Sequence, residues 1–168
     1  MSNYSISNRR KRTYISSHQF LDRWDWDLLA TLTFAPDDIR ISSHYARIKF
    51  ERWLWRHSKE KNMHMGAAYI LCYRCGHPHI HALLVGRGKT SNAPQTLRDA
   101  SISSFNRYWY NLTKIEIPEN QKAVTKYLAS HHFSYKCDRA TLDIVNEEFL
   151  GRLENRRQQQ QRNILGGI

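Results

Sequence analysis

Two short stretches of the chain predict β-strands: in one, polar and apolar residues alternate, and the other is apolar throughout. Residues 28–34 (LLATLTF) alternate threonine with leucine and phenylalanine, and residues 67–73 (AAYILCY) are apolar throughout. Such β-branched and aromatic stretches favour strands, in which successive side chains point to opposite faces. A further strand is expected from His79, after a turn over residues 74–78 that contains glycine and proline. The strand over residues 67–73 and the strand from His79 should form an antiparallel hairpin.

Apolar residues at intervals of three and four predict helices in other parts of the chain. We expect helices over residues 42–62, 96–111 and 121–132, a short strand over residues 114–117, and helix again from Asp143. Ser42 or Ser43 can cap the first of these helices. Its expected buried stripe consists of Ile41, Tyr45, Ile48 and Trp55, widened by Phe50, Trp53 and Leu54.

The resulting order β-α-β-β-α-β-α-α predicts an α+β fold. Strands joined by a hairpin and interleaved with helices favour an antiparallel sheet with helices packed mainly on one face. A chain of 168 residues is long enough for one domain with a real core. We expect that domain over residues 23–150, between a flexible basic arm over residues 1–22 and a polar basic tail over residues 151–168.

Charge narrows the range of partners. The chain has 26 Lys and Arg against 15 Asp and Glu, a formal net charge of +11. Such an excess favours a polyanion, with nucleic acid as the first candidate and an anionic membrane surface as the alternative. The sequence shows no apolar run near the length of a membrane span and no signal-peptide pattern, so a soluble, cytoplasmic protein is expected.

Histidines recur at every second residue where the third strand begins. On a strand, His79 and His81 share one face with Leu83 and Val85. Two imidazoles in this arrangement can reach one divalent cation, and imidazole suits Mn, Zn, Fe and Ni better than Mg. The alternative is a histidine-rich strand whose rings bind no metal.

Cysteines offer a second metal hypothesis. The odd count of three argues against a disulfide framework. Cys72 and Cys75 are separated by two residues and are followed by His77, which resembles part of a zinc knuckle. A structural zinc ion needs four ligands, so Cys137 or another histidine would have to complete the site.

Three segments, in this order, resemble the HUH endonuclease superfamily, in particular the replication initiators of rolling-circle plasmids and phages. Residues 29–34 (LATLTF) are similar to its opening strand motif. Residues 76–84 (GHPHIHALL) are similar to its metal strand, in which two histidines flank one bulky apolar residue. Residues 124–130 (VTKYLAS) are similar to its nucleophile helix. Together the segments span most of the chain.

The resemblance implies a ferredoxin- or RRM-like nuclease domain with the histidine strand at the centre of its sheet. It implies that His79 and His81 hold Mn²⁺ or Mg²⁺ and that Tyr127 attacks a phosphate of single-stranded DNA. The product would be a 5′-phosphotyrosine and a 3′-hydroxyl. The expected function is therefore a site-specific nickase and strand transferase that initiates rolling-circle replication at an origin or hairpin. No ATPase signature is present, so a host helicase is an expected partner.

Two positions depart from the pattern of this superfamily. Many relatives place a lysine three residues after the tyrosine, where this chain has Ser130. They also place a third ligand, commonly glutamate, about eight residues before the first histidine, where this chain has Leu71. His77 is the expected substitute, because it shares parity with His79 and His81 if the strand begins that early. The alternative interpretation of His77 is a histidine in the turn that faces solvent and binds no metal.

Other residues have expected roles around this site. The cations that we expect to contact DNA phosphates are Arg74, Arg87, Lys89, Lys122 and Lys126. Candidates for a second nucleophile are Tyr108, Tyr110 and Tyr135. Two other functions stay open: a nucleic-acid-binding module of the same fold without catalysis, and a nucleic-acid-binding protein stabilised by zinc.

Overall fold

The computed structural model describes most of the chain. The described residues are 14–35, 41–72, 78–100, 105, 109, 113–132 and 142–165. Within them, no helix is both long enough and apolar enough to cross a lipid bilayer.

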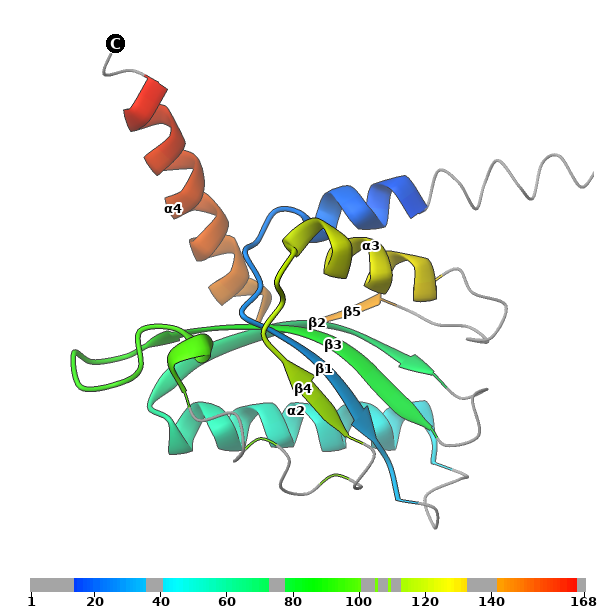
Figure 1. The fold of residues 1–168 in the computed structure, drawn as a ribbon. Helices are drawn as coiled ribbons and strands as arrows, with labels where there is room; N and C mark the ends of the chain where they lie inside the picture. The colour runs from blue at the N-terminus through cyan, green and yellow to red at the C-terminus, as the bar shows by residue number, and fades with distance from the viewer. Residues whose placement is uncertain are drawn as a thin grey trace, which may run out of the picture.

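An antiparallel sheet forms the centre of the fold (Figure 1). In the described part of the chain it has five strands in the order β4-β1-β3-β2-β5, and every neighbouring pair is antiparallel. The strands are β1 (Leu28–Thr33), β2 (Met63–Cys72), β3 (His79–Gly88), β4 (Lys114–Glu116) and β5 (Leu142–Val145). The predicted α+β class and the predicted β2–β3 hairpin are confirmed, and the histidine strand β3 is the central strand.

Helices cover both faces of the sheet, so the expectation that they pack mainly on one face is wrong. Helix α2 (Ser43–Glu60) lies on one face, whereas α3 (Gln121–His132) and a helix over residues 14–21 lie on the other (Figure 1). Within the range where a second long helix was predicted, Leu97–Asp99 form a short 3-10 helix, η2, and much of the rest of that range lies outside the described residues. Helix α4 (Glu147–Leu165) packs through its first turns and then projects from the body (Figure 1).

Two hydrophobic cores result, one on each side of the sheet. On β3, Ile80, Ala82 and Leu84 belong to the core beneath α2. Leu83 and Val85 belong to the core beneath α3 and α4. The period of two in the sequence therefore predicts correctly which side chains share the face of the two histidines.

The predicted buried stripe of α2 is confirmed at Phe50, Trp53 and Leu54 and is wrong at Tyr45 and Trp55. Tyr45 and Trp55 have 48% and 64% of their surface exposed, whereas Phe50, Trp53 and Leu54 are buried. Phe50, Trp53 and Leu54 belong to a stripe of helical spacing that runs from Ala46 to His57. The helix therefore turns this stripe toward the sheet and leaves the predicted positions at Tyr45 and Trp55 at the surface. The cap is as predicted, since Ser42 Oγ accepts a hydrogen bond from the Tyr45 amide at 3.1 Å. That cap stabilises the first turn.

The N-terminal boundary of the folded domain lies earlier than predicted. Residues 14–21 form a helix, and Leu21 has no exposed surface. The indole nitrogen of Trp26 donates to the Leu21 carbonyl at 2.9 Å, and that of Trp24 donates to the Leu150 carbonyl at 2.9 Å. At least residues 14–22 therefore belong to the folded unit, and the basic cluster at residues 9–12 lies outside the described residues.

Residues near Asp143 form a strand rather than the predicted helix. Strand β5 pairs with the edge of β2, and α4 begins only at Glu147. Asn146 separates the two elements with a φ of 60°, a left-handed conformation that asparagine tolerates. Its side-chain amide donates to the Met65 carbonyl at 2.9 Å and fixes this corner against β2. From Glu147 onward, α4 includes most of the expected C-terminal tail.

A buried carboxylate ties β3 to the loop that follows it. Asp27 is 3% exposed and accepts hydrogen bonds from the Gly86 amide and from Arg87 Nη1, both at 2.9 Å. The Leu97 amide donates to the same oxygen at 3.4 Å, and Arg98 Nε lies 3.6 Å from the other oxygen. Buried charge of this kind is tolerated only when it is paired and hydrogen-bonded. Asp27 therefore positions both η2 and the side chain of Arg87.

Candidate functional site

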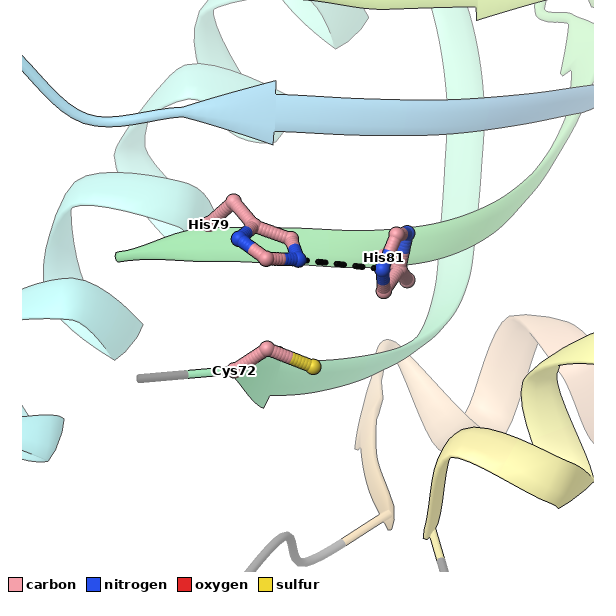
Figure 2. A group of neighbouring side chains, drawn as sticks. All are labelled: Cys72, His79 and His81. Atoms are coloured by element: carbon pink, nitrogen blue, oxygen red, sulfur yellow. Dashed lines mark hydrogen bonds between the residues drawn. The ribbon is translucent and has the colours of Figure 1, made fainter. Parts of the chain in front are cut away.

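Three possible metal ligands converge at one end of the β2–β3 hairpin. Cys72, His79 and His81 each offer one ligand atom, and these atoms all lie within 4.8 Å of one another. Figure 2 shows the side chains of the two histidines on β3, with Cys72 beside them on the neighbouring strand β2. Cys72 has no exposed surface, and His81 is 5% exposed. In the described part of the chain, this is the only group of three such donors.

Strand register explains why these three residues meet. Cys72 is the cross-strand partner of His79, and Ile70 is the partner of His81, so Cys72 projects from the same face as both rings. Leu71, the position at which the resemblance places a third ligand, pairs with Ile80 and packs into the core beneath α2. From the sequence alone, Cys72 is only a weak candidate for a ligand. Counting the hairpin register back from His79 is the signal that identifies it.

The two imidazoles face each other through their Nε2 atoms, which are 3.1 Å apart. Two nitrogen lone pairs at this separation repel unless a proton or a cation lies between them. Two nitrogens bound to one tetrahedral zinc ion lie about 3.3 Å apart, from zinc–nitrogen distances near 2.0–2.1 Å. The spacing and the donor types therefore fit a divalent cation bound by the two Nε2 atoms.

His81 is held as a neutral ring in a fixed orientation. Burial lowers the pKa of His81 to about 3, with further contributions from the neighbouring His79 and His131. The ring therefore stays uncharged at neutral pH, as a metal ligand must. Its Nδ1 atom lies 3.1 Å from the hydroxyl of Thr31 on β1. This contact at Nδ1 directs Nε2 toward His79, the arrangement in which the second nitrogen of a ligating histidine is hydrogen-bonded.

Tyr127 lies on the same face of the sheet as the histidines. Its hydroxyl is 3.4 Å from His81 Nδ1, and the two rings meet edge to face with centroids 5.3 Å apart. The distance is that of a close contact rather than of a strong hydrogen bond. The side chain is 37% exposed, whereas Val124 and Leu128 on the same helix are buried. The predicted nucleophile thus lies at the surface beside the predicted metal ligands.

Contacts with the N-terminal segment hold α3 in this position. The hydroxyl of Thr125 donates to Asp22 Oδ1 at 2.6 Å. The Gln121 side chain donates to the Trp26 carbonyl at 2.7 Å and accepts from the Trp26 amide at 2.9 Å. At the start of the helix, Asn120 Oδ1 accepts from the Ala123 amide at 3.1 Å, as expected of a cap.

His131 belongs to the site, although the sequence predicts no role for it. Its ring centroid lies 4.5 Å from that of His81 and 4.2 Å from that of Tyr127. His131 Nδ1 lies 3.0 Å from the Tyr127 carbonyl oxygen. The spacing of four residues after the tyrosine is the signal that predicts this contact. The hydroxyl of Ser130 donates to the Tyr127 carbonyl at 2.7 Å, a contact within its own helix.

The remaining predicted site residues lie in three places. His77 and Arg74 are outside the described residues, as are Cys75 and the tyrosines at 108, 110 and 135. Lys122 and Lys126 are exposed on α3, the helix that carries Tyr127. Arg87 and Lys89 lie at and just beyond the opposite end of β3 from the histidines, about 20–33 Å away at the usual rise of a strand.

Cations gather around Arg87 where β3 meets α4. Two adjacent hollows of about 260 and 380 Å³ share Arg87, Leu153 and Arg156 in their walls. Both hollows lie on the face of the sheet that α3 covers, because α4 packs through Phe149 and Leu150 into the core on that face. The other cations that line these hollows are Arg23, Lys89, Arg152 and Arg157. A third hollow of about 400 Å³, lined by aromatic and basic residues of α2, lies on the other face.

Comparison with known proteins adds no family assignment. A scan against family models gives no match, and searches of curated proteins and of solved structures give no significant match.

Proposed function

We propose that the protein is a metal-dependent endonuclease and strand transferase that acts on single-stranded DNA through Tyr127. The observation that supports this most strongly is the 3.4 Å contact between the Tyr127 hydroxyl and His81 Nδ1. The two residues are 46 positions apart and lie on different elements, yet the fold brings them to one face of the sheet. A tyrosine placed at random on a helix would rarely lie beside a pair of histidines that fits a cation.

In the proposed reaction, one end of the broken DNA strand becomes joined to Tyr127 through its phosphate. The energy of the broken phosphodiester bond is thereby conserved for rejoining. The phenol oxygen of Tyr127 attacks the phosphorus and forms a P–O bond, the P–O3′ bond breaks, and the departing 3′-oxygen takes a proton from solvent to become a hydroxyl. The phenol proton passes to solvent, which the partly exposed side chain reaches. In the reverse step a DNA 3′-hydroxyl attacks the phosphotyrosine and releases the tyrosine. Tyrosine suits this role because a phenol, with a reference pKa near 10, is far more acidic than an alcohol, so phenolate is a tolerable leaving group.

The chain's own residues orient the participants. His79 and His81 are the residues that would hold a divalent cation, which when bound polarises a phosphate oxygen and neutralises developing charge. Thr31 fixes the ring of His81, and His131 packs against the ring of Tyr127. These contacts hold the hydroxyl beside the site before DNA arrives, which reduces the entropy lost in reaching the transition state.

The two adjacent hollows beside α4 that share Arg87, Leu153 and Arg156, which we call the basic groove, support DNA as the substrate. The basic groove lies on the same sheet face as Tyr127, so a strand can contact both without crossing to the other side of the molecule. Arginine is suited to phosphate because its guanidinium group can donate two hydrogen bonds to it. Exposed Lys122 and Lys126 add positive charge on α3 itself.

The biological role that we propose is initiation of rolling-circle replication at an origin or hairpin of a plasmid or phage, in a bacterial, archaeal or virus-infected cell. The ordered resemblance of the three motifs to HUH initiators supports this finer assignment. We also propose that a host helicase unwinds the duplex, because no ATPase signature is present in the sequence.

Covalent attachment to DNA tests the proposed function. Incubation with circular single-stranded DNA and Mn²⁺, Co²⁺ or Zn²⁺ should yield a protein–DNA adduct that survives a denaturing gel. Treatment with a chelator before the DNA is added should suppress the adduct. Binding of the DNA without any adduct, in the presence of each of these ions and of Mg²⁺, would contradict the proposal and favour a binding module without catalysis.

Neutralising the basic groove should weaken DNA binding in a way that depends on salt. We expect the Arg152→Gln/Arg156→Gln variant to reduce the slope of log affinity against log salt concentration by about 1.4, because it removes two cations and each phosphate neutralised on a single strand contributes about 0.7 to that slope. The matched control is Arg47→Gln/Arg52→Gln, which removes two exposed arginines from α2 on the other sheet face. Fluorescence anisotropy at several salt concentrations measures both slopes. An equal reduction in the control would show that the groove is not the DNA path.

A further inference from the structure

The third donor beside the histidine pair is a sulfur atom, and this is unexpected for the ions that the resemblance implies. Cys72 is buried and projects from β2 directly opposite His79. The ligand atom that it offers lies within 4.8 Å of those of both histidines (Figure 2). No carboxylate belongs to this donor group, which is the only one in the described part of the chain.

Donor chemistry selects among divalent ions. Carboxylate, carbonyl and water ligands suit Mg²⁺ and Mn²⁺, whereas thiolate and imidazole suit zinc and similar ions. A site with one sulfur and two nitrogen ligands is therefore a poor match for Mg²⁺. Three protein ligands also leave one position of a tetrahedral ion for a water molecule or a substrate oxygen, as in catalytic rather than structural zinc sites.

We infer that the Cys72 thiolate is the third ligand of this centre and that the centre takes a thiophilic ion such as Zn²⁺ or Co²⁺ in preference to Mg²⁺. Binding forms the metal–sulfur bond and releases the thiol proton to solvent. The inference uses the proposed function only for the role of the ion, which is to polarise a DNA phosphate. The binding of the ion itself depends on the three side chains alone.

The zinc knuckle suggested by the sequence is a different site. It would use Cys72 together with Cys75 and His77, which lie beyond the end of β2 and outside the described residues. The inferred centre uses Cys72 together with His79 and His81 and requires neither of the other cysteines. Replacing those cysteines therefore separates the two arrangements.

Cobalt spectroscopy on a variant with a single cysteine provides the test. In the background Cys75→Ser/Cys137→Ser, Cys72 is the only thiol among the chain's three cysteines. Addition of Co²⁺ under reducing conditions should give one equivalent of bound ion, with a sulfur-to-cobalt charge-transfer band in the near ultraviolet. Zn²⁺ should displace the cobalt stoichiometrically, and a large excess of Mg²⁺ should not.

Substitutions at position 72 then identify the ligand. Cys72→Ser in the same background should abolish the charge-transfer band and weaken Zn²⁺ binding by about 100-fold or more, since loss of even an outer partner of a ligand costs 10- to 100-fold. Cys72→Asp offers an oxygen donor instead and should shift the preference toward Mn²⁺ relative to Zn²⁺ by about tenfold or more. Circular dichroism of the metal-free variants controls for folding.

Each outcome distinguishes this inference from the proposed function. A cobalt complex without a sulfur band, or a band that disappears when Cys75 and Cys137 are replaced, overturns the inference. DNA adduct formation that depends on Mg²⁺ and is unchanged in Cys72→Ser also overturns it and leaves the proposed function standing. A sulfur-ligated ion in a protein that never forms a DNA adduct supports the inference and contradicts the proposed function.

Discussion

A Tyr127→Phe variant is expected to lose covalent attachment to single-stranded DNA while it continues to bind that DNA. The substitution removes one hydroxyl, which is the proposed nucleophile, and leaves the ring that packs against His81 and His131. We expect adduct formation to fall to about one thousandth or less, the scale on which removal of a nucleophile acts in covalent catalysis. Denaturing gels measure the adduct, and anisotropy should show DNA affinity within about threefold of the original, since one exposed polar group contributes little.

The matched control for this variant is Tyr45→Phe. Tyr45 is 48% exposed on α2, whose buried residues pack into the core on the other face of the sheet. We expect this control to form adduct at the original rate. If the Tyr127→Phe variant formed as much adduct as the original protein, another tyrosine would have to be the nucleophile. The proposed mechanism would then lose its geometric basis.

Replacement of Asp27 by alanine is expected to cause the largest loss of stability among the substitutions discussed. It leaves the Gly86 amide and the guanidinium group of Arg87 without their buried acceptor. Breaking a buried ion pair by removal of one partner costs about 3–5 kcal/mol. The side chains of Arg87 and Arg98 are 33% and 40% exposed, so we expect the lower end, about 3 kcal/mol. Urea denaturation measures the change in the free energy of unfolding.

Asp25→Ala is the matched control for this second prediction. The Asp25 side chain is 62% exposed, and one of its oxygens lies 3.6 Å from Arg157 Nη1. An exposed pair of this kind contributes less than about 1 kcal/mol. Similar losses for the two variants would show that Asp27 does not anchor β3 to η2.

Much of the fold follows from local sequence patterns. The alternation in residues 28–34 predicts β1, and the turn before His79 predicts the hairpin whose second strand lies at the centre of the sheet. The apolar spacing around Tyr127, together with Pro118 and Asn120, predicts α3 with the observed bounds. In each of these segments the local preference and the burial agree, so no tertiary information is needed.

Other features depend on contacts between distant segments. Strand β5 is only four residues long, and its pairing with the edge of β2 is not visible in its own sequence. The helix over residues 14–21 is stabilised by the core in which Leu21, Trp24 and Trp26 pack, rather than by a strong pattern of its own. Tertiary packing also decides which face of α2 is buried, and therefore leaves Tyr45 and Trp55 exposed.

The candidate site is predictable in part. The alternation of histidines on a strand predicts His79 and His81, the resemblance to HUH initiators implies Tyr127, and the structure brings these three together. Counting along the chain assigns the third donor to the position of Leu71 or to His77. The register across the hairpin instead places Cys72 opposite His79, a relation that appears only when the two strands are paired.

Mapping the residue that carries DNA after the reaction tests the central claim most directly. After nuclease trimming, cleavage at lysine should release residues 127–136, which contain both Tyr127 and Tyr135, so tandem mass spectrometry must assign the site. The predicted result is a nucleotide joined through phosphate to Tyr127. A nucleotide on Tyr135 or on any other residue would contradict the account.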